Sequence, residues 1–155
     1  MSFGEEDRHL KEWFKQMLSA LEFDVITADV PQARPPLEKV EEMLANSQAV
    51  LAVVTRREKI EGTDAWTVPG WVQNELGMAH VQNKTIAIFR EKGVVLDGLG
   101  PLITEYEPFD RDALSESAPR IVRYLADLRN RARPGMSSPA TWVRLALSRG
   151  TWGKP

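Results

Sequence analysis

The sequence predicts a three-layer α/β sandwich built around a mainly parallel sheet. Short apolar segments alternate along the chain with longer segments in which apolar residues recur every three or four positions. Residues 49–54 are apolar without alternation, which is typical of a parallel strand covered by helices on both faces. Strands that alternate with helices favour right-handed crossovers and therefore parallel pairing. At 155 residues, the chain has the usual size of one domain.

Four helices are predicted, and three of them have one apolar face. In the first, apolar residues recur at helical spacing over about residues 9–21. In the last, Ile121, Val122 and Leu125 belong to the expected buried stripe. The second, third and fourth helices are expected at residues 37–46, 71–82 and 114–131.

The remaining strands are expected where short runs are rich in β-branched and apolar side chains, at residues 23–27, 85–89 and 105–109. Residues 56–68 are predicted to be a polar loop, and residues 134–139, rich in Pro, Gly and Ser, a linker. The apolar segment 141–147 is compatible with either a strand or a short helix. We therefore divide the chain into an α/β domain of residues 1–133 and a C-terminal tail of residues 134–155 that can contribute a strand.

Composition narrows the possible chemistry and location. Hydrophobic residues make up 43% and charged residues 27%, as in ordinary globular proteins, so we expect a folded core. The absence of cysteine and the presence of only two histidines argue against thiolate chemistry and a zinc site, and no metal is expected. A formal charge of −2 gives no general attraction to nucleic acid. Without a secretion signal or an apolar run near the ~20 residues that span a bilayer, we expect a cytoplasmic protein with no membrane contact.

Glu75 is the main candidate for chemistry. In an open α/β sheet, ligands bind beyond the carboxyl ends of the strands, where loops and helix starts supply polar groups, and Glu75 falls about one turn into the third predicted helix. Gly77 and Ala79 are small enough to let this helix lie close to the sheet. Trp66 and Trp71 can wall a pocket for a planar ring. The plainer interpretation is that Glu75 only complements the helix dipole and that the tryptophans belong to the core.

Other residues at this edge are less specific. Arg56 and Arg57 follow the central strand and can meet a phosphate group, or they are simply solvated loop charges. The dinucleotide-binding glycine motif, the phosphate-binding loop and the Gly-x-Ser-x-Gly elbow are all absent, so dehydrogenase, kinase and serine hydrolase functions are not expected. His9 and His80 have no acidic partner at a suitable spacing, and neither is assigned a role.

The region around Glu75 resembles two groups of proteins. The sequence Trp-Val-Gln-Asn-Glu-Leu-Gly-Met-Ala at residues 71–79, followed by an Asn-Lys pair and an apolar strand, is similar to the matching helix and strand of bacterial TIR-like domains. It equally resembles nucleoside 2-deoxyribosyltransferases, in which a glutamate followed by Leu-Gly and a small residue precedes a Gly-Lys and an apolar strand. Residues 2–7 and 29–36 are similar to the end of the first TIR strand and to the TIR BB loop. The likeness covers residues 2–130 and implies a flavodoxin-like sandwich.

By this resemblance, Glu75 is expected to be the catalytic carboxylate acting on an N-glycosidic bond to ribose or deoxyribose. The implied substrate of a TIR-like domain is NAD, cleaved to nicotinamide and ADP-ribose or a cyclised form, with no separate cofactor. Two alternatives stay open: a non-catalytic module that binds a nucleotide or assembles through TIR-type contacts, and a nucleoside deoxyribosyltransferase. A homo-oligomer in a bacterial stress or defence pathway is also implied. The residues implied in substrate binding are Phe3, Asp29, Arg34, Arg56 and Trp71.

The chain departs from this pattern in its first strand. Both families begin with an apolar strand, usually in the middle of the sheet, whereas only Ser2 and Phe3 match its end here. A gap in the middle of a sheet would leave backbone groups unpaired on two neighbouring strands. Either the sequence starts late relative to its relatives, or another segment fills the position. We hypothesise that residues 141–147 insert there, from the same chain or from a partner chain.

Overall fold

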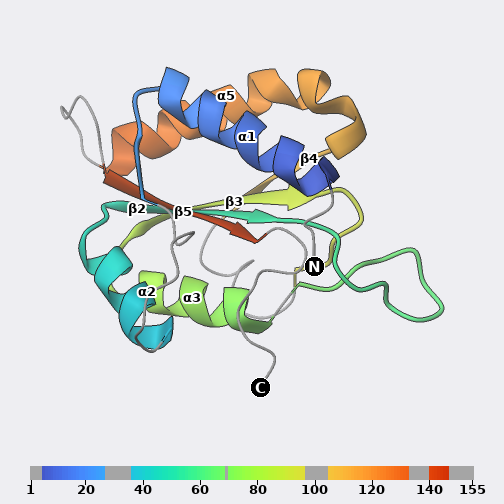
Figure 1. Cartoon of the computed structure of the whole chain (residues 1–155), viewed down its shortest axis with the longest axis horizontal. Coiled ribbons are helices and arrows are strands. Elements are labelled where there is room, and N and C mark those ends of the chain that lie inside the picture. Colours follow the sequence, from blue (N-terminus) through green and yellow to red (C-terminus); the bar gives the residue numbers. More distant parts are fainter. Residues whose placement is uncertain (1–4, 27–35, 69, 97–104, 133–139, 147–155) are drawn as a thin grey trace.

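The computed structural model describes residues 5–26, 36–68, 70–96, 105–132 and 140–146, and Figure 1 shows the course of the chain. The strands are β1 (Asp24–Ile26), β2 (Ala49–Val54), β3 (Thr85–Glu91), β4 (Tyr106–Phe109) and β5 (Ala140–Ala146). The helices are α1 (Glu5–Ala20), α2 (Pro36–Ala45), α3 (Gly70–Val81) and α5 (Leu114–Ala132), with the short 3₁₀ helix η1 (Arg111–Ala113) just before α5. These elements agree with the predicted ones to within a few residues at their ends.

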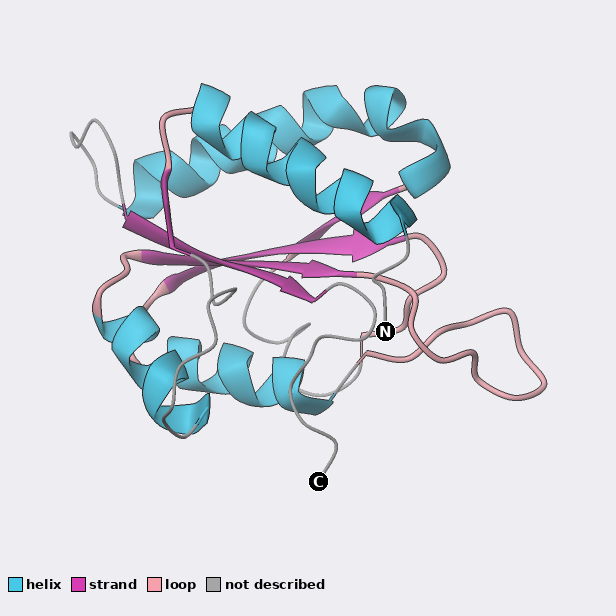
Figure 2. Ribbon diagram, in the orientation of Figure 1, coloured by secondary structure: helices cyan, strands magenta, loops and turns pink. Residues whose placement is uncertain are grey.

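The described strands form one five-stranded sheet in which β5 occupies an inner position (Figure 2). The strand order is β1-β5-β2-β3-β4, and every neighbouring pair is parallel. On one side of β5, Thr141 lies opposite Val25 of β1, and on the other side Val143 lies opposite Leu51 of β2. β5, the last described strand in the sequence, therefore lies between β1 and β2, the first two.

This order is that of a flavodoxin-like sheet, with β5 in the position of the first strand. The predicted flavodoxin-like α/β sandwich is therefore confirmed. Of the two conformations considered for residues 141–147, the structure has the strand over the described part of this segment, and the strand pairs within its own chain. The physical reason is that β5 satisfies the inward-facing N–H and C=O groups of both β1 and β2.

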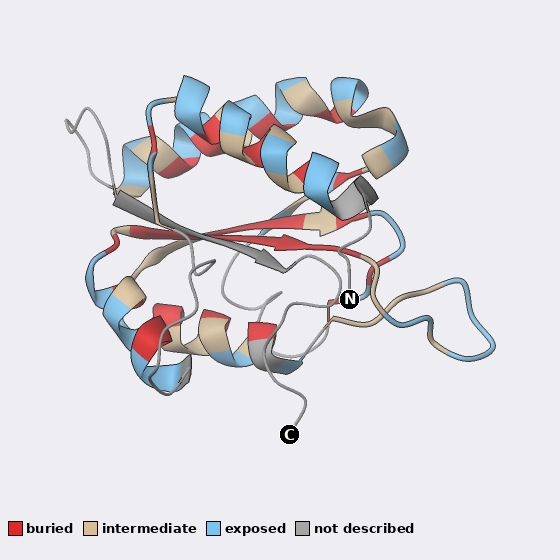
Figure 3. Ribbon diagram, in the orientation of Figure 1, coloured by how far each residue is buried: buried red, intermediate tan, exposed pale blue. Residues whose placement is uncertain are grey.

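Helices cover both faces of the sheet, so the molecule has three layers (Figure 1). α1 and α5 lie on one face, and α2 and α3 lie on the other. β2 is buried at every position, as its red ribbon in Figure 3 shows. Residues 49–54 thus form the doubly covered parallel strand that their unbroken apolar run predicts.

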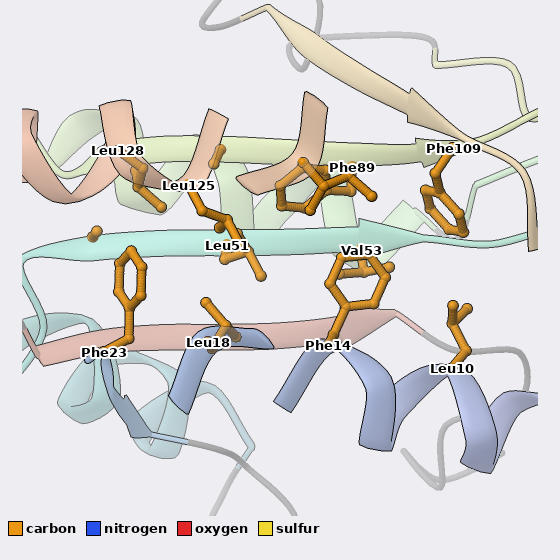
Figure 4. Close-up of a cluster of buried hydrophobic side chains, with 13 residues drawn as sticks. Leu10, Phe14, Leu18, Phe23, Leu51, Val53, Phe89, Phe109, Leu125 and Leu128 are labelled. Atoms are coloured by element: carbon orange, nitrogen blue, oxygen red, sulfur yellow. The ribbon is translucent and has the colours of Figure 1, made fainter. Parts of the chain in front are cut away.

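The larger part of the core lies between the sheet and the pair α1 and α5. Leu51 and Val53 of β2 and Phe89 of β3 meet Phe14 and Leu18 of α1 (Figure 4). The rings of Phe14 and Phe89 are 5.4 Å apart between centroids, within the range of favourable aromatic pairs. This packing holds the two central strands against α1.

The buried stripe of α5 differs from the expected one at Ser117 and Val122. Its buried residues are Ser117, Ile121, Leu125 and Leu128, whereas Val122 is 38% exposed. Each residue of an α-helix is turned by about 100° from the one before it, so Val122 points away from the sheet once Ile121 faces it. Ser117, whose hydroxyl donates to the carbonyl of Ala113, is the first buried residue of the stripe.

Candidate functional site

α3 begins at the edge of the sheet where the strands have their carboxyl ends. Val72, in the first turn of α3, belongs to the same buried cluster as Val54, the last residue of β2. Ala79, near the end of α3, packs instead with Val50, near the start of β2. α3 therefore runs opposite to β2. Its first turns lie at the carboxyl edge, where ligands of open α/β sheets bind.

Glu75 lies on the side of α3 that faces the sheet. It is three residues after Val72 and four before Ala79, both of which are buried, and residues at these spacings share one face of a helix. The side chain is half-buried, and its Oε2 is withdrawn from solvent. Glu75 is five residues after Gly70, the first residue of α3, which places it about 7.5 Å along the helix axis. The predicted position of this carboxylate, near the start of the helix, agrees with the structure.

The strand order reverses between β5 and β2, which makes this pair the switch point of the sheet. β1 lies on one side of β5, whereas β2, β3 and β4 follow on the other side. The last residues of the two strands, Ala146 and Val54, are register partners, so both strands end at the same level. The connection from β2 to α3 leaves from this point, through the buried Thr55. In flavodoxin-like sheets the ligand crevice lies beyond such a pair of strand ends.

Arg56 also lies at the carboxyl edge, but its contacts are within the protein. Its backbone N–H donates to Oε2 of Glu91 at 2.8 Å, and its Nε donates to the carbonyl of Lys92 at 2.8 Å. Nε also lies 3.8 Å from Oε1 of Glu91, and the side chain is 32% exposed. These contacts fix the start of the β2–α3 connection. The resemblance predicts a role of Arg56 in substrate binding, whereas these contacts favour a structural role for its side chain.

Glu91 is a charged residue that the sequence analysis did not single out. Its side chain is 0% exposed, at the end of β3, and it forms an ion pair with Arg111 in η1. Nη2 of Arg111 donates to Oε2 at 2.8 Å, and Nε of Arg111 donates to Oε1. Ala87 and Phe89 face α1 and α5, so the two-residue period of the strand turns Glu91 to that face as well. Glu91 and Arg56 therefore meet on the face opposite to α3 and Glu75.

The predicted polar loop of residues 56–68 carries a short two-stranded projection. The N–H of Thr67 donates to the carbonyl of Glu58, and Lys59 and Trp66 form an antiparallel bridge. At the base of the projection, the Trp66 N–H donates to the carbonyl of Gly93 at 2.9 Å. Cδ1 of Trp66 lies 3.6 Å from the point that a Cβ on Gly93 would occupy, so the ring covers this glycine. Trp66 anchors the projection to the turn after β3.

The other proposed binding residues are described only in part. Trp71 lies in the first turn of α3, one turn before Glu75, but the description covers its backbone and not its side chain. Phe3, Asp29 and Arg34 lie outside the described residues. Their binding roles stay predictions from the resemblance.

The other features of the described residues do not indicate a second functional site. A shallow depression of about 400 Å³ is lined by residues 59–64, all from the projecting loop and away from Glu75. Within the described ranges, no three His, Asp or Glu side chains gather as ligands for a metal ion. No helix in the described part of the chain is both long and apolar enough to cross a membrane.

The fold and the placement of Glu75 thus define a flavodoxin-like α/β protein with a partly buried carboxylate at the carboxyl edge of its sheet, near the end of β2. Comparisons with protein-family models, with curated proteins and with solved structures gave no match.

Proposed function

We propose that this protein cleaves the N-glycosidic bond between nicotinamide and ribose in NAD, with Glu75 as the catalytic carboxylate. The observation that carries the proposal is the position of Glu75, on the sheet-facing side of α3, near its start and at the carboxyl end of β2, with Oε2 withdrawn from solvent. This is the edge at which α/β sheets of this order bind ligands.

The chemistry of the bond explains why a carboxylate belongs there. As the bond between a base and ribose breaks, positive charge develops on the sugar ring, and a carboxylate beside the anomeric carbon either stabilises this charge or attacks the carbon. Exclusion of water strengthens the electrostatic effect, because the local dielectric constant is lower than in bulk solvent. Glu75 supplies the carboxylate, and its half-buried side chain is partly shielded from water. Trp71, one helical turn earlier, is the residue proposed to stack on the departing nicotinamide.

The resemblance to TIR-like domains favours NAD as the substrate, whereas the resemblance to nucleoside 2-deoxyribosyltransferases favours transfer between bases. The two reactions share the first step, release of a base from the anomeric carbon, and differ in the acceptor, which is water or a second base. As part of the TIR-like proposal, we also propose that the protein is cytoplasmic, forms a homo-oligomer and acts in bacterial defence.

The experiment is to incubate the protein at high concentration with NAD and, separately, with deoxynucleosides, and to measure free base by chromatography. Nicotinamide released from NAD supports the proposal. Exchange of a deoxynucleoside base for an added second base identifies a transferase instead. If neither substrate releases a base at any protein concentration tested, the proposed activity is wrong, and the non-catalytic module is the better account.

A further inference from the structure

Arg90 differs from most arginines of the described chain in its lack of an acidic partner there. Five other arginines form ion pairs with carboxylates, namely Arg56, Arg111, Arg120, Arg129 and Arg131. Arg90 forms no such pair among the described residues, and its Nε is buried without a hydrogen-bond acceptor in that part of the chain. A donor withdrawn from water without an acceptor is unfavourable, so its presence calls for an explanation.

Arg90 lies on the same face and at the same edge of the sheet as Glu75. Ile88, two residues earlier in β3, packs in one cluster with Val72 of α3, and the period of the strand turns Arg90 to the same side. The register partner of Arg90 in β2 is Val54, which belongs to this cluster too. Glu75 and Arg90 therefore flank one apolar cluster, the first from the helix and the second from the sheet.

The guanidinium of Arg90 is already oriented by an aromatic ring. Its Cζ lies 3.9 Å from the centroid of the Tyr106 ring in β4. A guanidinium over a ring face keeps its N–H groups available in its own plane for other acceptors. This planar fork matches two oxygens of a phosphate group, and its orientation in advance lowers the entropy lost on binding.

We propose that Arg90 binds a phosphate group of the substrate and so forms a second part of the Glu75 site. The choice of ligand rests on the proposed function, because in NAD the pyrophosphate is attached to the same ribose whose bond to nicotinamide is cleaved. A carboxylate from α3 at the anomeric carbon and a cation from β3 at the phosphate then contact one ligand at one edge of the sheet. The chemical class recognised is an ADP-ribosyl group.

The test is the affinity of the full-length chain for ADP-ribose, measured by isothermal titration calorimetry. Arg90→Gln should weaken binding about tenfold or more, because a charge-assisted hydrogen bond to phosphate is lost. Arg120→Gln is the matched control, since Arg120 pairs with Glu107 and is 60% exposed, and it should change the affinity less than about twofold. Adenosine, which has no phosphate, should bind equally to the wild type and to Arg90→Gln. Arg90→Lys, which keeps the charge but not the fork, should fall between the two and guards against a misfolded Gln variant.

Equal affinity of the wild type, Arg90→Gln and Arg90→Lys for ADP-ribose would overturn the proposal, as would no ADP-ribose binding by the wild type. The result is independent of turnover. Suppose that NAD cleavage depends on Glu75 but that substitution of Arg90 leaves the affinity for ADP-ribose unchanged. This result refutes only the phosphate site. If ADP-ribose binding depends on Arg90 but the protein does not cleave NAD, only the proposed function is refuted.

Discussion

Glu91 at the end of β3 and Arg111 at the start of η1 form a bidentate ion pair inside the protein. Both Nε and Nη2 of Arg111 donate to the carboxylate, whose side chain is 0% exposed. Oε2 of Glu91 also accepts the backbone N–H of Arg56 at 2.8 Å. One carboxylate thus ties the ends of β2 and β3 to the segment that leads into α5. It fixes the sheet edge from which the connection to the Glu75 helix departs.

Glu91→Gln should lower the free energy of unfolding by about 3 kcal/mol, because Arg111 keeps its largely buried charge without a counter-charge. Urea unfolding followed by circular dichroism measures the loss. Asp127→Asn is the control, since Asp127 and Arg131 form an exposed pair, and it should cost less than about 0.5 kcal/mol. If Glu91→Gln were as mild as the control, the ion pair would not hold the sheet edge together.

Arg56→Gln should affect stability more than ligand binding, because the Arg56 Nε bonds the carbonyl of Lys92 within the protein. Loss of one such bond is expected to cost about 1 kcal/mol, which lowers the melting temperature by about 2–4 °C in a chain of this size. The affinity for ADP-ribose should change less than about twofold. An unchanged melting temperature together with weaker binding would return Arg56 to the substrate site.

Removal of residues 134–155 should abolish cooperative unfolding, because β5 pairs with both β1 and β2 and its loss exposes the backbone of both strands. Thermal denaturation and size-exclusion chromatography provide the measurement. A shorter deletion of residues 148–155 leaves all of β5 in place and serves as the control. A truncation at residue 133 that unfolds cooperatively at the wild-type temperature would show that β5 is dispensable.

Trp71→Ala should weaken substrate binding more than it lowers the melting temperature, because Trp71 precedes Glu75 by one turn of α3. Titration with NAD under conditions of slow turnover gives the affinity, and thermal denaturation gives the stability. Trp66→Ala is the comparison, since the Trp66 ring covers Gly93 at the base of the projecting loop, and there the loss should appear in stability. A large drop in melting temperature with unchanged NAD affinity would assign Trp71 to the core.

The elements could be predicted where a local pattern reflects the environment of the residues. The unbroken apolar run of β2 is such a pattern, and the position of Glu75 followed from the predicted start of the next helix. The position of β5 was harder, because its apolar and β-branched residues indicate a strand but not its neighbours. Only the argument that no inner position of a sheet can stay empty suggested where it inserts.

Long-range polar contacts could not be predicted in this way. Glu91 and Arg111 are 20 residues apart, and nothing in the sequence around either residue indicates that they meet. The apolar run predicted a strand that ends at Phe89, whereas β3 continues to Glu91, whose buried charge is paired with Arg111. The bridge between Trp66 and Val94 also joins distant parts of the sequence, so it could not be predicted either.

The most direct test of the account is the rate at which Glu75→Gln releases nicotinamide from NAD. The substitution keeps the size of the side chain and removes its charge, so the account predicts a loss of at least about 10²-fold relative to the wild type. Glu61→Gln, which alters an exposed glutamate in the projecting loop, should retain the full rate, and both variants should melt close to the wild-type temperature. A Glu75→Gln variant that keeps more than about a tenth of the wild-type rate would contradict the assignment of Glu75 as the catalytic carboxylate.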